Sequence, residues 1–350
     1  MSTTTRPEHG ATRSTGPRPV ALLLPGQGAQ HVRMAAGLYP DEPLFTAVLD
    51  EVFEMLGEEG TRLRADWLSA CPAVPIDHVT RAQPLLFAVD YALSRLVLSW
   101  GVRPVALLGH SMGELVAATL AGVFGLRDAV GVVRDRVRRA LDAPPGGMLA
   151  VAASPGEVEP HLRDGVVIGA INAPRQTVLA GAEGPLRTVE AALGAQEISC
   201  RRVPSLTAFH SPVLAPANEG AERLFGALAM AEPDTTIYSG YTASPLRPEE
   251  ATDPAFWARQ PVDPVLFWPA LEALLGDGDF LLVEAGPGQG LAQLARRHPA
   301  VRARRSAVVS LLPARPGPPE ADRASVCAAR DALVAEGTCP VCLPRDVDIL

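Results

Sequence analysis

The feature that most constrains this chain is a serine between two glycines, at the centre of residues 104–121. The apolar run from Val105 to Leu108 predicts a buried strand, and the small apolar residues from Leu115 to Ala121 predict a helix. A strand that turns sharply into a helix leaves no room for side chains, which explains the glycines on both sides. Ser111 is then exposed at the positive end of the helix, where backbone N–H groups can stabilise an oxyanion. The pattern predicts a nucleophilic serine.

Composition narrows the class of protein. The chain has 350 residues, 47% of them hydrophobic and 20% charged, which is typical of a globular protein. No apolar run has the length of a membrane span, and the first 18 residues lack the apolar core of a secretory signal. A net charge of −8 argues against nucleic acid as a partner. We therefore expect a cytoplasmic protein with no membrane or nucleic-acid partner.

The order of predicted elements indicates an α/β core with a smaller inserted unit. A strand at residues 20–24 leads into a glycine-rich loop around Gln27, a place where α/β proteins bind ligands. Helical patterning covers residues 41–70, and Gln83–Pro84 is expected to open the next helix. Residues 147–206 show the order βαββαβ, which is the ferredoxin-like pattern. We expect a flexible tail at 1–18, a core at 19–146 and 207–312, the insertion at 147–206, and a linker and C-terminal tail at 313–350.

A helix expected from Asp128 to Leu141 brings one arginine close to the interior. Arg136 lies beside Ala129 and Ala140, at the edge of the apolar stripe of this helix. An arginine that leans inward needs an anion, which can be a protein carboxylate or a carboxylate on a ligand. The helix phase alone leaves both alternatives open.

One histidine suits the role of base for the serine. His210 follows the inserted unit directly, at a junction where clefts form, and a serine nucleophile needs a base from elsewhere in the chain. His110 adjoins Ser111, so its side chain is expected to point in another direction.

The C-terminal part contains two further patterns. Five arginines within ten residues form a basic patch, which is either a solvated face or a docking surface for an acidic partner; they are Arg296, Arg297, Arg302, Arg304 and Arg305. Cys339 and Cys342 have the spacing of a zinc knuckle, but no second pair accompanies them. We therefore expect no metal site, although the role of this tail stays open.

Five short motifs occur in the order and at the spacing of one enzyme family. They are Pro25–Gln30, Gly109–Glu114, Arg136, Ala208–Ser211 and Gly286–Gly288. Over residues 20–310 the chain resembles the malonyl-CoA:acyl-carrier-protein transacylases and the acyltransferase domains of polyketide synthases. As a free-standing chain, it also resembles trans-acting members of that family. The resemblance implies an α/β-hydrolase-like core with a parallel sheet and an inserted ferredoxin-like subdomain, in agreement with the pattern of elements.

The resemblance also implies a catalytic role for each matching residue. Ser111 would be the acylated nucleophile and His210 its base, with the base oriented by a backbone carbonyl at Gln260. The backbone N–H groups of Gln27 and Met112 would form the oxyanion hole.

Three more matches concern the acyl group. Arg136 matches the arginine that holds the free carboxylate of malonyl, and His110 would lie beside that carboxylate. Met112 and Phe209 are similar to the residues of malonyl-type members.

The implied reaction is a ping-pong transfer of an acyl group in polyketide or fatty-acid biosynthesis. Malonyl is the expected group, moving from CoA to Ser111 and then to the phosphopantetheine thiol of an acyl carrier protein. No cofactor or metal is expected. Carrier proteins are acidic, so Arg201, Arg202 and the five arginines of residues 296–305 are the expected docking residues.

Three other functions remain open at this point. A trans-acting enzyme could move a non-malonyl acyl group between carrier proteins, although Arg136 favours a carboxylated group. An acyl hydrolase of the ordinary α/β type would need a catalytic histidine late in the chain. The only histidine after His210 is His298, which lies in the exposed arginine-rich stretch. A non-catalytic carrier-protein binder would not need Ser111, His210 and Gln27 together.

Overall fold

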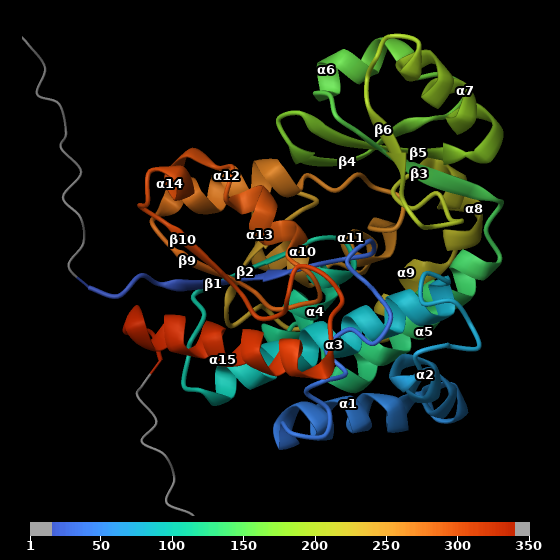
Figure 1. Ribbon diagram of the computed structural model, residues 1–350. Coiled ribbons are helices and arrows are strands. Elements are labelled where there is room, and N and C mark those ends of the chain that lie inside the picture. The colour runs from blue at the N-terminus through green and yellow to red at the C-terminus, as the bar shows by residue number, and fades with distance from the viewer. Residues whose placement is uncertain (1–15, 340–350) are drawn as a thin grey trace, which may run out of the picture.

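The structure, a computed structural model, describes residues 16–339. Its strands form two sheets, one of six strands and one of four. The larger sheet lies among helices, and the smaller sheet stands apart from it with its own helices (Figure 1). This arrangement confirms the predicted fold class, an α/β core with a parallel sheet and an inserted ferredoxin-like subdomain.

The larger sheet consists of parallel strands with one short antiparallel strand at an edge. Its order is β10 (Ala307–Ser310), β9 (Leu281–Glu284), β1 (Val20–Leu24), β2 (Ala106–Gly109), β7 (Thr236–Ser239) and the antiparallel β8 (Ser244–Pro245). In the middle, Leu22 of β1 pairs with Leu107 of β2 and with Val283 of β9. Because these strands are parallel, the loops that follow β1, β2, β7 and β9 emerge at one edge, where α/β proteins bind their ligands.

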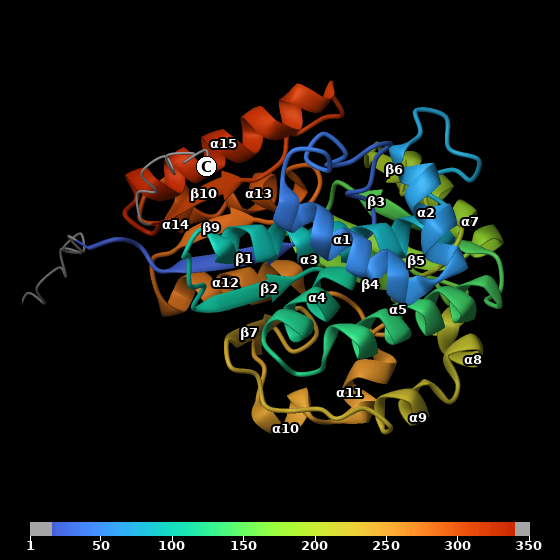
Figure 2. The ribbon, with the colours of Figure 1, turned by 90° about the horizontal axis from the view of Figure 1, so that it is seen from below.

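Helices cover both faces of this sheet because alternate residues of each strand point in opposite directions. Val20, Leu22 and Leu24 face the cluster built by α1 (Pro43–Leu56), α3 (Val79–Ser99), α4 (Met112–Leu120), α5 (Leu126–Leu141) and α15 (Pro319–Ala335). Ala21 and Leu23 face α12 (Phe267–Asp277), α13 (Gly290–Ala295) and α14 (Pro299–Arg302). Figure 2 shows α1 and α15 on the outside of the first face, together with α2 (Glu58–Leu68).

The smaller sheet has the strand order of the ferredoxin-like pattern. Its antiparallel strands lie in the order β4 (Val167–Ala173), β5 (Gln176–Ala182), β3 (Gly146–Val151) and β6 (Cys200–Arg202). Two helices pack on one face, α6 (Pro155–Val158) and α7 (Glu183–Gly194), and they bury a separate small core around Leu149, Leu179 and Leu186.

The two sheets are joined by backbone as well as by side chains. Val265, which precedes α12, donates its N–H to Gly169 O (2.9 Å) and accepts from the N–H of Ile171 (2.8 Å), so it pairs with strand β4. Arg297, beyond α13, donates to the side-chain oxygen of Gln176 at 3.2 Å. The smaller sheet is therefore hydrogen-bonded to the core at one of its edge strands.

Short helices complete the core between β6 and β9. They are α8 (Ala215–Asn218), α9 (Ala221–Phe225), α10 (Pro248–Ala251) and α11 (Pro254–Arg259). Helix α11 packs against α9, and Arg136 of α5 donates hydrogen bonds to Trp257 of α11 and to Gln260, so the end of α11 lies beside α5.

One predicted helix boundary is wrong. Helix α3 begins at Val79, so Pro84 lies inside it, and the Thr80 carbonyl that loses its helical donor accepts from the Arg81 side chain at 3.3 Å. The helical patterning predicted at residues 41–70 is confirmed, as the two helices α1 and α2, which are separated at Gly57 with its φ of 63°.

The segment assigned to a linker and tail contains the long helix α15. Its residues Val326, Ala329 and Leu333 are buried, and Asp322 accepts the N–H of Gly37 at 3.0 Å. The domain boundaries expected from the sequence, with the insertion at residues 147–206, stay predictions. Cys339 is buried and donates to the Trp100 carbonyl at 3.3 Å, while Cys342 lies outside the described residues.

Residues 16–339 offer neither a helix suited to cross a membrane nor a cluster of metal-binding side chains. None of their helices combines the length and the apolar character that a membrane crossing needs. Within the same residues, no group of three or more His, Cys, Asp or Glu side chains could hold a metal ion.

Candidate active site

Ser111 lies on a tight turn between β2 and α4, as the glycine pattern predicts. Its φ is 53° and its ψ is −109°, a strained conformation for a residue with a side chain. The turn packs directly on the loop after β1. A Cβ on Gly113 would lie 1.9 Å from Leu24 O, and one on Gly26 would lie 2.3 Å from His110 O. The two glycines therefore let the two loops touch through their backbones, and the serine is held at the edge of the sheet.

His210 is hydrogen-bonded to this serine. The distance from Ser111 Oγ to His210 Nε2 is 2.8 Å. On the other side of the ring, Nδ1 lies 3.1 Å from the Gln260 carbonyl and 2.9 Å from the Asp263 carbonyl. Carbonyls only accept hydrogen bonds, so Nδ1 must carry the proton and Nε2 must present its lone pair to the serine. This is the tautomer that a general base needs.

Burial sets the protonation state of the base. The residue is 5% exposed, and the loss of solvent lowers the pKa of His210 to about 4 from its usual 6.5. The two carbonyls oppose this shift, whereas the nearby His110 and Arg136 add to it. The imidazole is therefore neutral at physiological pH and ready to accept a proton.

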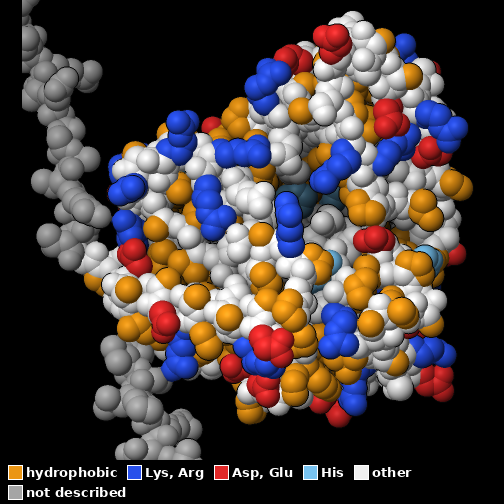
Figure 3. Space-filling model, viewed as in Figure 1, with side chains coloured by type: hydrophobic (Ala, Val, Ile, Leu, Met, Phe, Trp, Pro, Cys, Tyr) orange, Lys and Arg blue, Asp and Glu red, His pale blue; other side chains and the backbone are white. Residues whose placement is uncertain are grey.

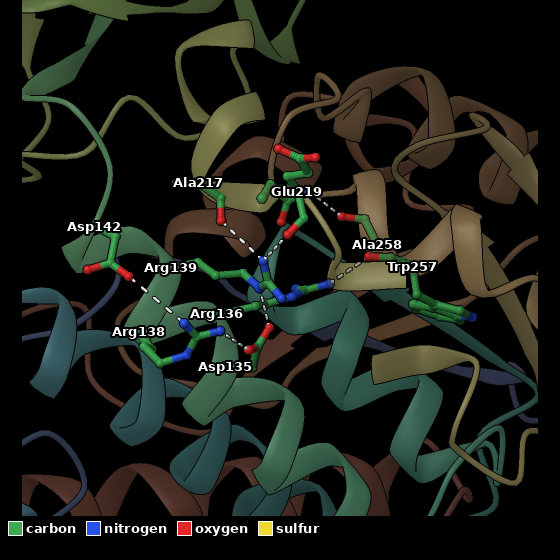
Figure 4. A network of polar contacts seen from close by, with 10 residues as sticks. Asp135, Arg136, Arg138, Arg139, Asp142, Ala217, Glu219, Trp257 and Ala258 are labelled. Carbon is green, nitrogen blue, oxygen red and sulfur yellow. Dashed lines mark hydrogen bonds and ion pairs between the residues drawn. The ribbon is translucent and has the colours of Figure 1, made fainter. Parts of the chain in front are cut away.

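Arg136 enters the site from helix α5. Its Nη2 donates to Gln260 Oε1 at 2.8 Å and to the Trp257 carbonyl at 3.2 Å. Figure 4 shows its guanidinium turned toward the Trp257–Ala258 segment, whereas Arg138 and Arg139 are paired with Asp135. Arg136 forms no ion pair with any residue of the described range 16–339.

Two buried donors at this position remain unsatisfied. Arg136 Nε and Gln260 Nε2 have no hydrogen-bond partner among residues 16–339. Burial also lowers the pKa of the Arg136 guanidinium below its ordinary value, which still leaves it cationic. A buried cation with free donors favours an anionic ligand. Gln260 connects this position to the base, because its backbone carbonyl faces His210 while its side chain holds Arg136.

Ser111 and His210 open onto a small cavity of about 170 Å³ between the two sheets. The core contributes Gln27, His110 and Phe209 to its walls, and the smaller sheet contributes Met148, Gly169, Asn172 and Val178. Figure 3 shows the hollow between the two parts of the molecule, with arginines on its rims. The cavity has space for a small acyl group and the end of a thiol arm.

Comparison with known proteins identifies the family. The family described as "Acyl transferase domain" matches residues 22–315. The chain belongs to this family. It is 38% identical over 295 residues to a phenolphthiocerol/phthiocerol polyketide synthase of Mycobacterium tuberculosis, and the match covers 83% of this chain but only 20% of that protein.

Solved structures agree with this assignment. The acyl transferase domain of SpnD, in complex with 2-(pent-4-yn-1-yl)malonyl, superposes with a TM-score of 0.85 at 31% identity, covering 93% of this chain and 78% of that one. An acyl-carrier-protein S-malonyltransferase of Burkholderia pseudomallei gives 0.76 at 26% identity, covering 89% of this chain and 99% of that one. The acyl transferase fold is therefore shown along most of the chain.

The remaining predicted residues of this acyl transferase lie around the same cavity. His110 Nε2 is 2.8 Å from Asn172 Oδ1 in the smaller sheet, and burial lowers its pKa. The Gln27 side chain accepts from Gln83 at 2.6 Å, which fixes the loop after β1. Met112 is buried at the first turn of α4, and Phe209 is 7% exposed beside the base.

Sequence reasoning missed three contributors to the site. Asp263 supplies a second carbonyl to His210, but a backbone acceptor leaves no trace in residue type. Glu114 is fully buried, and burial raises its pKa to about 8. Tyr241 follows β7, and its ring lies beside that of His210, with the centroids 6.2 Å apart. Glu114 could have been found, since an acid among the small apolar residues of a buried helix needs an explanation. Tyr241 stands in an ordinary polar segment and gave no such signal.

Proposed function

We propose that this acyl transferase moves a malonyl group from CoA, through an ester on Ser111, to the phosphopantetheine thiol of an acyl carrier protein. The observation that carries the proposal is the pair of unsatisfied buried donors, Arg136 Nε and Gln260 Nε2, joined through Gln260 to the Ser111–His210 pair. The arrangement combines a nucleophile, its base and a cationic pocket for a second carboxylate.

The first half of the proposed reaction acylates the serine. Ser111 Oγ attacks the thioester carbonyl while His210 Nε2 accepts its proton, a contribution of about 10²–10⁴ in rate. The N–H groups of Gln27 and Met112 stabilise the oxyanion of the tetrahedral intermediate. When the intermediate collapses, the C–S bond breaks, and the CoA thiolate takes the proton from His210.

The second half reverses these steps with a new thiol. The carrier's pantetheine thiol gives its proton to His210 and attacks the ester, and Ser111 Oγ leaves with that proton. The chemistry as written needs no metal or organic cofactor. Water would hydrolyse the ester, and the small cavity between the sheets limits its access.

The assignment of malonyl rests on the missing counter-ion. A buried guanidinium is costly unless it is paired, and Arg136 forms no ion pair within residues 16–339. The distal carboxylate of malonyl would supply both the charge and the acceptor atoms that Arg136 and Gln260 lack. An acetyl group has no such carboxylate.

The proposed carrier-protein surface is formed by arginines on the rim of the cavity. Arg201 lines the cavity itself, and Arg297 is bonded to Gln176 at its mouth. Within the described residues, Arg202 and Arg305 already form ion pairs with acids, so they are weaker members of the predicted surface. An acidic carrier protein would meet the exposed residues Arg201, Arg296, Arg297, Arg302 and Arg304.

Mass spectrometry of the intact protein tests the proposal. The chain is mixed briefly with malonyl-CoA, methylmalonyl-CoA or acetyl-CoA and then with a carrier protein that bears its pantetheine arm. We expect a malonyl adduct that is lost to the carrier and that is absent from the Ser111→Ala variant. An adduct that persists in Ser111→Ala contradicts the nucleophile. An adduct lost to water as fast as to the carrier indicates a hydrolase, and no adduct from any CoA indicates a donor bound to a carrier protein.

A further inference from the structure

Tyr241 occupies the space beside the nucleophile. Its ring centroid lies 6.2 Å from that of His210, whose Nε2 is 2.8 Å from Ser111 Oγ. The phenol ring therefore lies beside the base that is hydrogen-bonded to Ser111, close to any group esterified to that serine.

The backbone that carries Tyr241 is fixed to the helix after the nucleophile. Glu114 Oε1 accepts from Ser239 Oγ at 2.5 Å, and its Oε2 accepts the N–H of Gly240 at 2.8 Å. Ser239 Oγ in turn accepts the N–H of Tyr241 at 3.0 Å. Two consecutive residues are thus bonded directly to one buried carboxyl group on α4, and Tyr241 is bonded to it through Ser239, so this turn is held to the helix that follows Ser111.

The ring of Tyr241 is also confined on its sides. Phe256 meets it edge-on, with centroids 6.4 Å apart and an angle of 88° between the planes, and the imidazole of His210 lies on another side. Phe256 is itself 1% exposed and packs on Trp257 in the core. A substituent on the acyl chain cannot push the ring aside without disturbing the base or the core packing.

We propose that Tyr241 sets the size of the acyl group that this enzyme accepts, by blocking substituents on the carbon between the two carbonyls of a malonyl group. The inference rests on the proposed function, because it concerns the acyl group on Ser111. Malonyl itself carries only hydrogens on that carbon. A methyl or ethyl branch at the same position meets the phenol ring.

Shortening the side chain tests this role. Tyr241→Val removes the ring, and the kcat/KM for methylmalonyl-CoA relative to malonyl-CoA should rise about tenfold or more, the discrimination that one methyl group gives in a tight pocket. Tyr241→Leu is a second, milder opening that should move the ratio in the same direction. Tyr241→Phe keeps the ring and should leave the ratio within about threefold of wild type, which separates size from the hydroxyl group.

A matched control lies three residues away. The Tyr238 hydroxyl is bonded to Asp277 at 2.6 Å, away from Ser111, so Tyr238→Phe should change neither the ratio nor the acylation rate. The wild-type chain gives an independent measurement, because its rates should fall from malonyl- to methylmalonyl- to ethylmalonyl-CoA.

The outcomes separate this inference from the proposed function. If wild type acylates Ser111 with malonyl but Tyr241→Val and Tyr241→Leu leave the ratio unchanged, only the role of Tyr241 is overturned. Equal wild-type rates for malonyl and ethylmalonyl overturn it as well, even if the variants fail to fold. If wild type forms no malonyl ester on Ser111, the proposed function itself fails.

Discussion

The two halves of this active site differ in how completely their polar atoms are bonded. In the catalytic half, Ser111 and both ring nitrogens of His210 have partners within the protein. In the acyl-binding half, Arg136 Nε and Gln260 Nε2 are buried without a partner among residues 16–339. The first half is therefore organised without a substrate, whereas under the proposed function a ligand would complete the second half. This difference teaches that rate and choice of acyl group can be altered separately.

The largest effect should come from breaking the catalytic half at its base. His210→Ala removes the proton acceptor of Ser111, and the acylation rate should fall by about 10²–10⁴ for malonyl and acetyl donors alike. Single-turnover formation of the acyl protein measures it. His161→Ala, a histidine on the smaller domain away from the cavity, is the control and should behave as wild type. A loss confined to malonyl would place His210 in the acyl-binding half instead.

The second-largest effect should come from a substitution that removes a group from the acyl-binding half alone. Arg136→Ala removes the cation, and kcat/KM for malonyl-CoA should fall about a hundredfold or more, because the substrate carboxylate is buried without a partner. Acetyl-CoA should lose little. Arg138→Ala is the matched control on the same helix, since its side chain is 61% exposed and paired with Asp135. An equal loss for both donors would mean that Arg136 serves the fold.

A smaller effect should come from Gln260, a single residue that contacts both halves of the site. Gln260→Met keeps the backbone carbonyl that faces His210 but removes the amide that holds Arg136. We expect about a tenfold loss for malonyl-CoA, since one hydrogen bond to a charged group is removed. The acetyl rate should stay near that of wild type. If acetyl transfer falls equally, the two functions of Gln260 are not separable.

The smallest effect concerns pH. Because burial lowers the pKa of His210 to about 4, its neutral form persists far below the usual value of 6.5. The acid limb of kcat/KM for acylation should therefore lie near pH 4, with little change between about pH 5.5 and 7.5. A half-maximal rate near pH 6.5 would show that the base is more exposed to solvent than the structure has it.

The features that could be predicted from the sequence depend on residues that are close together in the chain. The strand, glycines and helix around Ser111 are contiguous in the sequence. All elements of the βαββαβ order of the smaller sheet fall within about sixty consecutive residues. Arg136 was placed correctly at the edge of its helix stripe by phase alone. The start of α3 was missed, because Pro84 is tolerated when a side chain satisfies the carbonyl it orphans.

Contacts between loops that are far apart in the sequence could not be predicted from such local patterns. The Asp263 carbonyl and the Tyr241 ring reach His210 only because β7 and the segment after α11 end at the same edge of the sheet as β2. Residue type does not record which backbone carbonyl a histidine meets. Glu114 was part of a recognised motif, yet its task became visible only when Ser239 and Gly240 were seen to bond to it.

The pairing of Val265 with strand β4 bears on how substrates could enter the cavity. Two backbone hydrogen bonds and the Arg297–Gln176 contact tie the smaller sheet to the core beside the mouth of the cavity. A clamshell that opens for CoA and closes on the ester would have to break these bonds in each cycle. If the proposed transfer is right, we therefore expect the two pantetheine arms to use one entrance in turn, so that the first arm leaves before the second arrives.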